Sequence, residues 1–235
     1  MHGRAADLEL QNLGPKTLDV PDVIPIFPLP ETVLLPGEVL PLHVFEPRYR
    51  ALVRDAVASH KVIGIVQVVP GFETELPGSP PVRETGCIGY IASHEELPDG
   101  RFMLWLLGLE RFRILEELDP STPYRQVRVR YEPTPESPKR LAEIRPLREE
   151  LRELLPGLVE LDNSARDQFA NHIAQVSDAQ LIALACQILT LGSDRKQEVL
   201  EAGSLSDRFL MVYEDLYRHY DLNPGVENLD PDRLN

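Results

Sequence analysis

The sequence is poor in the residues from which most catalytic and metal centres are built. Its 235 residues include two cysteines, six histidines and four lysines. No two histidines stand at the His-x-x-x-His spacing that brings two metal ligands to one helix face. No glycine directly precedes a lysine, so the phosphate-binding loop that ends in Gly-Lys-Ser/Thr is absent. We therefore expect no metal site, no cofactor and no catalytic centre in these residues.

Long apolar runs and an excess of basic residues are also lacking. The longest near-apolar run, 181–192, falls well short of the ~20 residues that span a bilayer, and residues 1–20 carry no secretory signal. These features predict a cytoplasmic protein without a membrane partner, in which Cys87 and Cys186 are reduced thiols. The net charge of −14 makes nucleic acid an improbable general partner, since binding of the phosphate backbone needs a basic surface.

Apolar runs punctuated by prolines predict strands in the first half of the chain. Glu46-Pro47 suits the first turn of a helix, and apolar residues then recur at three- and four-residue spacing up to Val57. Asp99-Gly100 predicts a hairpin between two longer runs. The predicted strands are 23–27, 33–35, 39–44, 62–69, 86–92, 101–109, 111–118 and 124–131.

The period changes to that of helices after a proline-rich hinge, EPTPESPKR, at residues 132–140. Ser177 with Gln180 three residues later predicts a capping box that opens one of four or five helices. We thus expect a loose leader over 1–19, a β-rich domain over 20–133 and a helical bundle domain over 134–235. The fold class is α+β, with the strands and one helix in a closed or partly closed barrel.

The segment PIFPLPETVLLPGEVLPLHVFEPRYRALV (25–53) resembles the opening motif of the Lon protease amino-terminal domain. The segment GCIGYIASHEELPDGRFMLWLLGLERFRILE (86–116) is similar to that family's glycine-led strand, its Leu-Pro-Asp-Gly hairpin and the strand that follows. The resemblance implies a pseudo-barrel related to the PUA-like folds and a substrate-recognition role. It brings neither the ATPase nor the Ser–Lys peptidase of the full protease, whose motifs this sequence lacks.

Five residues are candidates for peptide binding. Arg48 and Tyr49 lie in the family-like motif, where Tyr49 suits a core position with its hydroxyl at the rim. Phe72 lies in a loop rich in proline and glycine, where an aromatic side chain can anchor a ligand. Arg128 and Arg130 belong to a basic run that either binds an acidic partner or forms a solvated outer face. Trp105, with apolar neighbours in its strand, is predicted to be core.

The functional expectation is a non-catalytic module that binds unfolded proteins or peptides, as an adaptor in protein quality control alongside a protease or chaperone. The alternative is a PUA-like nucleic-acid-binding domain that uses the arginine-rich strands. The sequence leaves the oligomeric state open.

Overall fold

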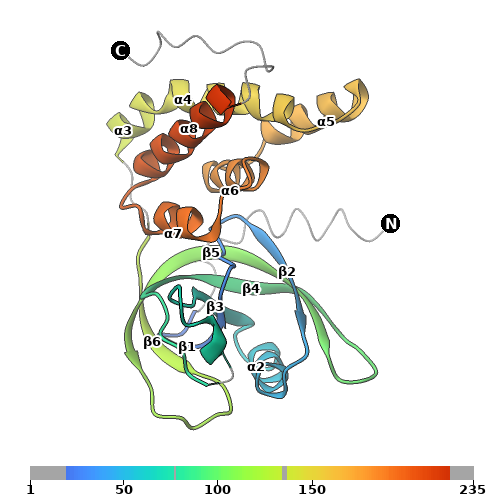
Figure 1. Ribbon diagram of the computed structural model, residues 1–235, viewed down its shortest axis with the longest axis vertical. Coiled ribbons are helices and arrows are strands. Elements are labelled where there is room, and N and C mark those ends of the chain that lie inside the picture. Colours follow the sequence, from blue (N-terminus) through green and yellow to red (C-terminus); the bar gives the residue numbers. More distant parts are fainter. Residues whose placement is uncertain (1–19, 77, 134–136, 223–235) are drawn as a thin grey trace. The chain divides into compact units, whose positions relative to one another are not determined.

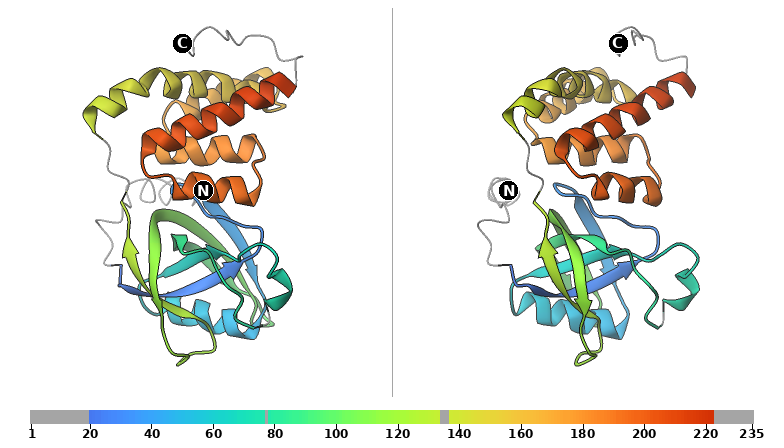
Figure 2. Two further views of the ribbon diagram at one scale, coloured as in Figure 1. Left: turned by 60° about the vertical axis from the view of Figure 1, so that its left-hand side comes forward. Right: turned by 90° about the vertical axis from the view of Figure 1, so that its left-hand side faces the viewer.

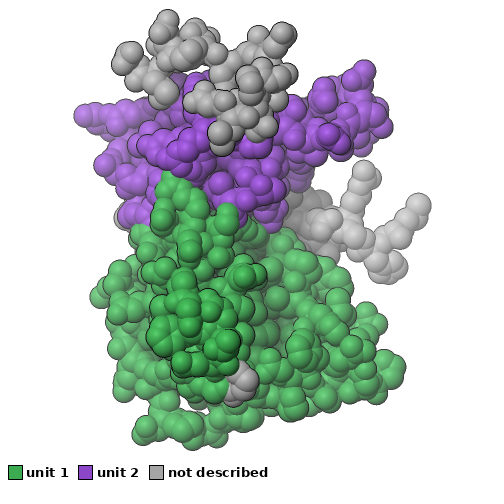
Figure 3. All heavy atoms as spheres, viewed as in Figure 1, with its two compact units in different colours: residues 1–133, 192–201 green, residues 134–191, 202–235 purple. Residues whose placement is uncertain are grey.

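The computed structural model describes residues 20–76, 78–133 and 137–222. The chain divides into two compact units, coloured separately in Figure 3. Unit 1 contains residues up to Pro133 together with residues 192–201, and unit 2 contains residues 134–191 and those after 201. The predicted leader, residues 134–136 of the predicted hinge and the end of the chain lie outside the described residues.

Unit 1 is built on a six-stranded mixed sheet that closes into a barrel (Figures 1 and 2). The strand order is β2-β5-β4-β3-β1-β6, and β5 also pairs with β6, so β2 alone among these strands is hydrogen-bonded on one side. The pair β1–β3 is parallel and the other pairs are antiparallel. The strands are β1 (Val23–Leu29), β2 (Val39–Val44), β3 (Val62–Gln67), β4 (Thr85–Glu96), β5 (Phe102–Glu117) and β6 (Gln126–Tyr131).

The predicted first helix and hairpin are confirmed. Helix α2 (Pro47–Val57) starts with Pro47 at its first turn and buries Tyr49, Leu52, Val53 and Ala56. The turn between β4 and β5 closes through the Gly100 N–H and the Leu97 carbonyl, with Gly100 at φ +78°. That left-handed conformation is one that glycine adopts without a steric penalty.

Two strand predictions are wrong. Residues 33–35 form a buried loop, because the Leu35 N–H and carbonyl are both used locally by Glu38. The segments 101–109 and 111–118 are one continuous bent strand, β5, which pairs with β2 and β4 in its first part and with β4 and β6 in its second. Register shifts in these ladders allow the strand to bend rather than break.

Helix α7 (Ser193–Glu201) groups with unit 1. Polar contacts fix it to the barrel. Lys196 pairs with the buried carboxylate of Glu38 at 2.9 Å, and the Gln197 side chain donates to the Thr85 carbonyl at 3.0 Å. Arg111 donates to the carbonyls of Leu200 and Glu201, which satisfies acceptors at the end of the helix.

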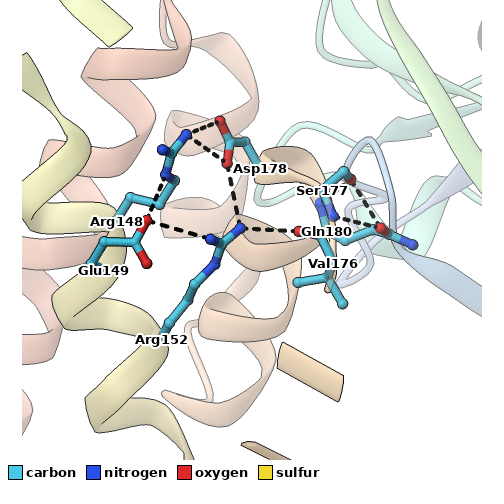
Figure 4. A network of polar contacts seen from close by, with 7 residues as sticks. All are labelled: Arg148, Glu149, Arg152, Val176, Ser177, Asp178 and Gln180. Atoms are coloured by element: carbon cyan, nitrogen blue, oxygen red, sulfur yellow. Dashed lines mark hydrogen bonds and ion pairs between the residues drawn. The ribbon is translucent and has the colours of Figure 1, made fainter. Parts of the chain in front are cut away.

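Unit 2 consists of helices that pack on one another around α4 and α6. Ser177 forms the predicted capping box with Gln180, so the start of α6 is confirmed (Figure 4). Arg148 of α4 pairs with Asp178 of α6 at 3.2 Å, and Arg152 donates to the Val176 carbonyl. The helices are α3 (Pro138–Glu143), α4 (Arg145–Leu154), η2 (Leu155–Leu158), α5 (Asn163–Ile173), α6 (Asp178–Ile188) and α8 (Leu205–Leu222).

Cys87 and Cys186 are both buried, and no disulfide joins them. Within the described ranges no helix is long and apolar enough to cross a membrane. The same residues include no group of three or more His, Cys, Asp or Glu side chains arranged to hold a metal ion.

Candidate functional site

One face of the sheet, at β2 and the first half of β5, carries exposed apolar side chains. Alternate residues of a strand share a face, and directly paired residues of neighbouring strands project to the same side. Pro41 pairs directly with Trp105, and the ring of Phe45, which follows the end of β2, lies 6.1 Å from that of His43. Phe45 is 61% exposed and Val39 is 52% exposed. We define the apolar face as Val39, Pro41, Phe45, Met103 and Trp105.

Trp105 corrects the expectation that it belongs to the core. Its side chain is 37% exposed, whereas its neighbours in sequence, Leu104 and Leu106, are fully buried on the opposite side of β5. The residues paired with it, Pro41 and Ser93, are too short to cover an indole ring. An apolar run therefore indicates a strand without indicating which of its two faces is covered.

The free edge of β2 is poorly suited to pairing with another strand. Glu38 accepts a hydrogen bond from Gly108 of β5, and backbone groups of successive residues alternate in direction along an antiparallel strand. The residues at odd positions, Pro41 among them, therefore direct their backbone groups away from β5. Since Pro41 has no N–H, strand addition at this edge would lack a central hydrogen bond. A ligand is better held by the side chains of the apolar face.

A separate pocket of about 370 Å³ lies in unit 1 at the start of α2. Its walls come from Pro28 at the end of β1, Arg48 and Tyr49 of α2, residues 78–79, and the connection between β5 and β6 at residues 117–120 and 122–126. Its volume is within the range of about 300 to 1,000 Å³ typical of sites for small ligands.

Two arginines hold the walls of this pocket in place. The Arg48 guanidinium donates to Glu46 at 3.0 Å and to the carbonyls of Leu76 and Gly78. The Arg125 guanidinium forms two parallel hydrogen bonds with Glu117, at 2.7 and 2.8 Å, and a third with the Pro80 carbonyl. These bonds join α2, the loop before β4 and the start of β6, so the pocket is formed before any ligand binds.

Tyr49 forms the buried wall of the pocket. Its ring stacks on Phe27 with centroids 4.1 Å apart, and the Arg48 guanidinium lies 4.5 Å from the ring centroid. Burial raises the pKa of the Tyr49 hydroxyl, an effect that Arg48 and Arg125 partly oppose. The phenol is therefore neutral at physiological pH and can donate a hydrogen bond. This placement agrees with the expectation of a core ring with its hydroxyl at a rim.

The neighbouring Tyr124 gives a pH-dependent prediction. Burial, followed by the 2.6 Å hydrogen bond that its hydroxyl donates to Asp55, raises the Tyr124 pKa to about 12. Because the unfolded pKa is about 10, this contribution to stability is complete below pH 10 and is lost as the pH rises towards 12. We expect Tyr124→Phe to flatten the decline in unfolding free energy over that interval, measured by urea denaturation at several pH values. An unchanged slope would contradict the assignment.

The other three candidate residues lie away from this pocket. Phe72 is 38% exposed, at the start of the short η1 helix (Glu73–Glu75). Arg128 pairs with Glu116 at 3.3 Å, and Arg130 pairs with Glu132 at 3.0 Å. The hydrogen bond from Arg130, together with the charges of Arg113 and Arg111, lowers the Glu132 pKa.

The arginine-rich strands form a surface of mixed charge. Arg113 pairs with both Glu84 and Glu132, and Arg125 pairs with Glu117. Arg111 is buried and donates to backbone carbonyls. Because glutamates accompany these exposed guanidinium groups, the strands offer no strong basic patch, and nothing found supports the nucleic-acid alternative.

Unit 2 contains a second cavity, of about 540 Å³, between α4, η2 and α5. Ala170, Ala174 and Gly157 line it together with charged residues of both signs. Arg152, one of these charged residues, already binds the Val176 carbonyl. This cavity combines small residues with balanced charge and presents no distinctive chemistry.

Comparison with known families identifies the family of this chain. Residues 23–218 match the family described as the ATP-dependent protease La (LON) substrate-binding domain. The chain belongs to the Lon substrate-binding domain family. Its fold class, an α+β pseudo-barrel with helices after it, and the resemblance seen in the sequence are thereby confirmed.

Curated relatives of this Lon domain are much longer proteins. The chain is 32% identical over 218 residues to the Lon protease of Anaeromyxobacter dehalogenans, covering 88% of this chain and 25% of that protein. It is 31% identical over 201 residues to Lon protease 2 of Myxococcus xanthus, covering 85% and 24% respectively. The chain thus spans about a quarter of the length of these relatives.

Two solved Lon domains share the fold. The N-terminal domain of the Mycobacterium avium complex Lon protease superposes with a TM-score of 0.66 at 18% identity, covering 84% of this chain and 99% of that one. The Lon N-terminal domain protein from Xanthomonas campestris gives a TM-score of 0.56 at 24% identity, covering 83% and 97%. At these identities the likeness establishes the fold and does not identify binding residues in this chain.

Proposed function

We propose that this chain is a non-catalytic recognition module that binds exposed apolar segments of unfolded proteins or peptides. The observation that carries the proposal is the apolar face, where Phe45 and Trp105 present aromatic side chains to solvent. Membership in the Lon substrate-binding domain family supports a substrate-recognition role. The module would serve as an adaptor in cytoplasmic protein quality control.

The apolar face suits a disordered apolar ligand better than a folded one. Burial of apolar surface contributes ~25 cal/mol per Å², and aromatic anchors often dominate the binding energy of an interface. Pro41 disfavours binding by strand addition, so the ligand needs no particular backbone register. Recognition by side chains without a fixed register would tolerate many sequences, which quality control requires.

Chemistry on the bound segment would come from a partner. The residues of this chain include no phosphate-binding loop and no serine motif of a peptidase. The module would therefore hand the bound segment to a partner protease or chaperone. Native pull-down with mass spectrometry would identify it.

We expect Trp105→Ser and Phe45→Ser each to weaken binding of a reduced, carboxymethylated unfolded protein by roughly tenfold or more. Each change removes an exposed aromatic anchor while leaving the buried core intact. Affinity would be measured by fluorescence anisotropy with the labelled unfolded protein. Circular dichroism would establish that the variants are folded.

Leu210→Ser is the matched control, because Leu210 is 45% exposed but lies on α8 of unit 2. It should bind as the unmodified chain does. If the Trp105 and Phe45 variants bound unfolded protein as tightly as the unmodified chain does, or if the unmodified chain did not bind it, the proposed function would be refuted.

A further inference from the structure

The pocket at the start of α2 contains hydrogen-bond donors that the described chain does not use. A guanidinium group has five N–H donors. Arg48 and Arg125 each donate three hydrogen bonds to other described residues, which leaves two N–H donors on each. Both side chains line the pocket and are largely buried, at 21% and 15% exposure.

The Tyr49 hydroxyl is a further unused donor. Tyr49 is 5% exposed and lines the pocket, yet its hydroxyl makes no hydrogen bond with any residue that the structure describes. A buried hydroxyl without a protein partner is costly unless water or a ligand satisfies it.

The local charge decides which acceptor fits. Each arginine is already paired with one carboxylate, Glu46 for Arg48 and Glu117 for Arg125, so the four groups sum to zero. Asp119 also lines the pocket. The lining therefore offers no net positive charge to any anion. A dianionic phosphate would bring two negative charges into it, whereas a carboxylate brings one, which the several available N–H and O–H donors can stabilise.

The remaining walls are apolar. Pro28, Leu118, Pro120 and Pro123 line the same space. A ligand that fits therefore joins a carboxylate to an adjacent apolar group. The last residue of a protein chain has that combination, since its carboxylate and its side chain stand on the same carbon atom. An internal aspartate or glutamate has no apolar group so close to its carboxylate, and the chain continues on both sides of it.

We propose that this pocket binds the carboxyl terminus of a protein chain that ends in an apolar residue. The terminal carboxylate accepts hydrogen bonds from the Tyr49 hydroxyl and from free N–H groups of Arg48 and Arg125. The terminal side chain packs against the prolines. This inference rests on the proposed function, because it assigns one class of segment to the module, at a site separate from the apolar face.

The test compares fluorescein-labelled pentapeptides that end in two leucines, with either a free or an amidated carboxyl terminus, in anisotropy titrations with the full chain. The free acid should bind at least tenfold more tightly than the amide. Tyr49→Phe, which keeps the ring stacked on Phe27, should weaken binding of the free acid by roughly tenfold. Its melting temperature should stay unchanged, because the lost hydroxyl has no described partner.

Tyr131→Phe is the matched control. The Tyr131 hydroxyl donates to the Pro21 carbonyl at 2.6 Å, and Tyr131 does not line the pocket. This variant should lose thermal stability and keep the affinity for the free acid. The two phenylalanine variants thus have opposite expected effects on binding and on stability.

Equal affinity for the acid and the amide would overturn the inference, as would equally tight binding of an amidated peptide with an internal aspartate. Failure of the free acid to bind, at concentrations where unfolded protein saturates the apolar face, would overturn it while leaving the proposed function intact. Binding of the free acid without binding of unfolded protein would uphold the pocket and refute the apolar face.

Discussion

Glu38→Ala should lower the free energy of unfolding by about 3 to 5 kcal/mol. The Glu38 side chain is 5% exposed, and its two oxygens accept from the Leu35 N–H and from Lys196, each at 2.9 Å. Its removal leaves a largely buried ammonium group without its carboxylate and a buried N–H without its acceptor. Both losses carry the full cost of desolvation.

Urea denaturation followed by circular dichroism measures this effect. Glu84→Ala is the control, since Glu84 pairs with Arg113 at 3.3 Å with its side chain 75% exposed. Exposed pairs contribute about 0 to 1 kcal/mol, so this variant should remain close to the unmodified chain. If Glu38→Ala cost no more than Glu84→Ala, the pairing of α7 with the barrel would be refuted.

Gly108→Ala should also destabilise the chain strongly, by about 3 kcal/mol. A methyl group at this position of β5 would stand 2.1 Å from the Leu35 carbonyl oxygen, so backbone must move to admit it. Displacing the loop at Leu35 also disturbs the backbone hydrogen bonds that Gly108 shares with Gly37 and Glu38.

Gly157→Ala provides the comparison, because a methyl group there meets no atom within 4 Å. Thermal denaturation should show a melting temperature lowered by several degrees for Gly108→Ala and nearly unchanged for Gly157→Ala. Equal melting temperatures would show that the loop yields without cost.

Local signals in the sequence predicted local structure well. Pro47 at the first turn of α2, the turn at Gly100 and the capping box at Ser177 depend on residues within a few positions of one another. The strand prediction for residues 33–35 was wrong because local apolar character does not show where the backbone hydrogen bonds go. The apolar residues of this segment are buried as a strand's would be, but its backbone is engaged by Glu38 rather than by a neighbouring strand.

The candidate sites depend on contacts between distant residues, which a single sequence does not reveal. Arg48 and Tyr49 lie in the family-like motif, whereas Arg125 lies in the segment 124–131, which the sequence predicts only as a strand. The role of Arg125 in the pocket appears only when Pro80, 45 positions earlier in the chain, is brought to it. The exposure of Trp105 likewise depends on which short residues happen to pair with it.

The assignment of α7 to unit 1 bears on how the chain folds during synthesis. The chain passes between the two units at residues 133, 191 and 201, so residues 134–191 of unit 2 interrupt unit 1 in the sequence. Until the ribosome has delivered residues up to 201, Glu38 lacks its ammonium partner and Thr85 lacks the Gln197 side chain. A newly made barrel therefore waits for residues 134–201 before its last polar contacts close, and such unfinished intermediates expose surface that the native state buries.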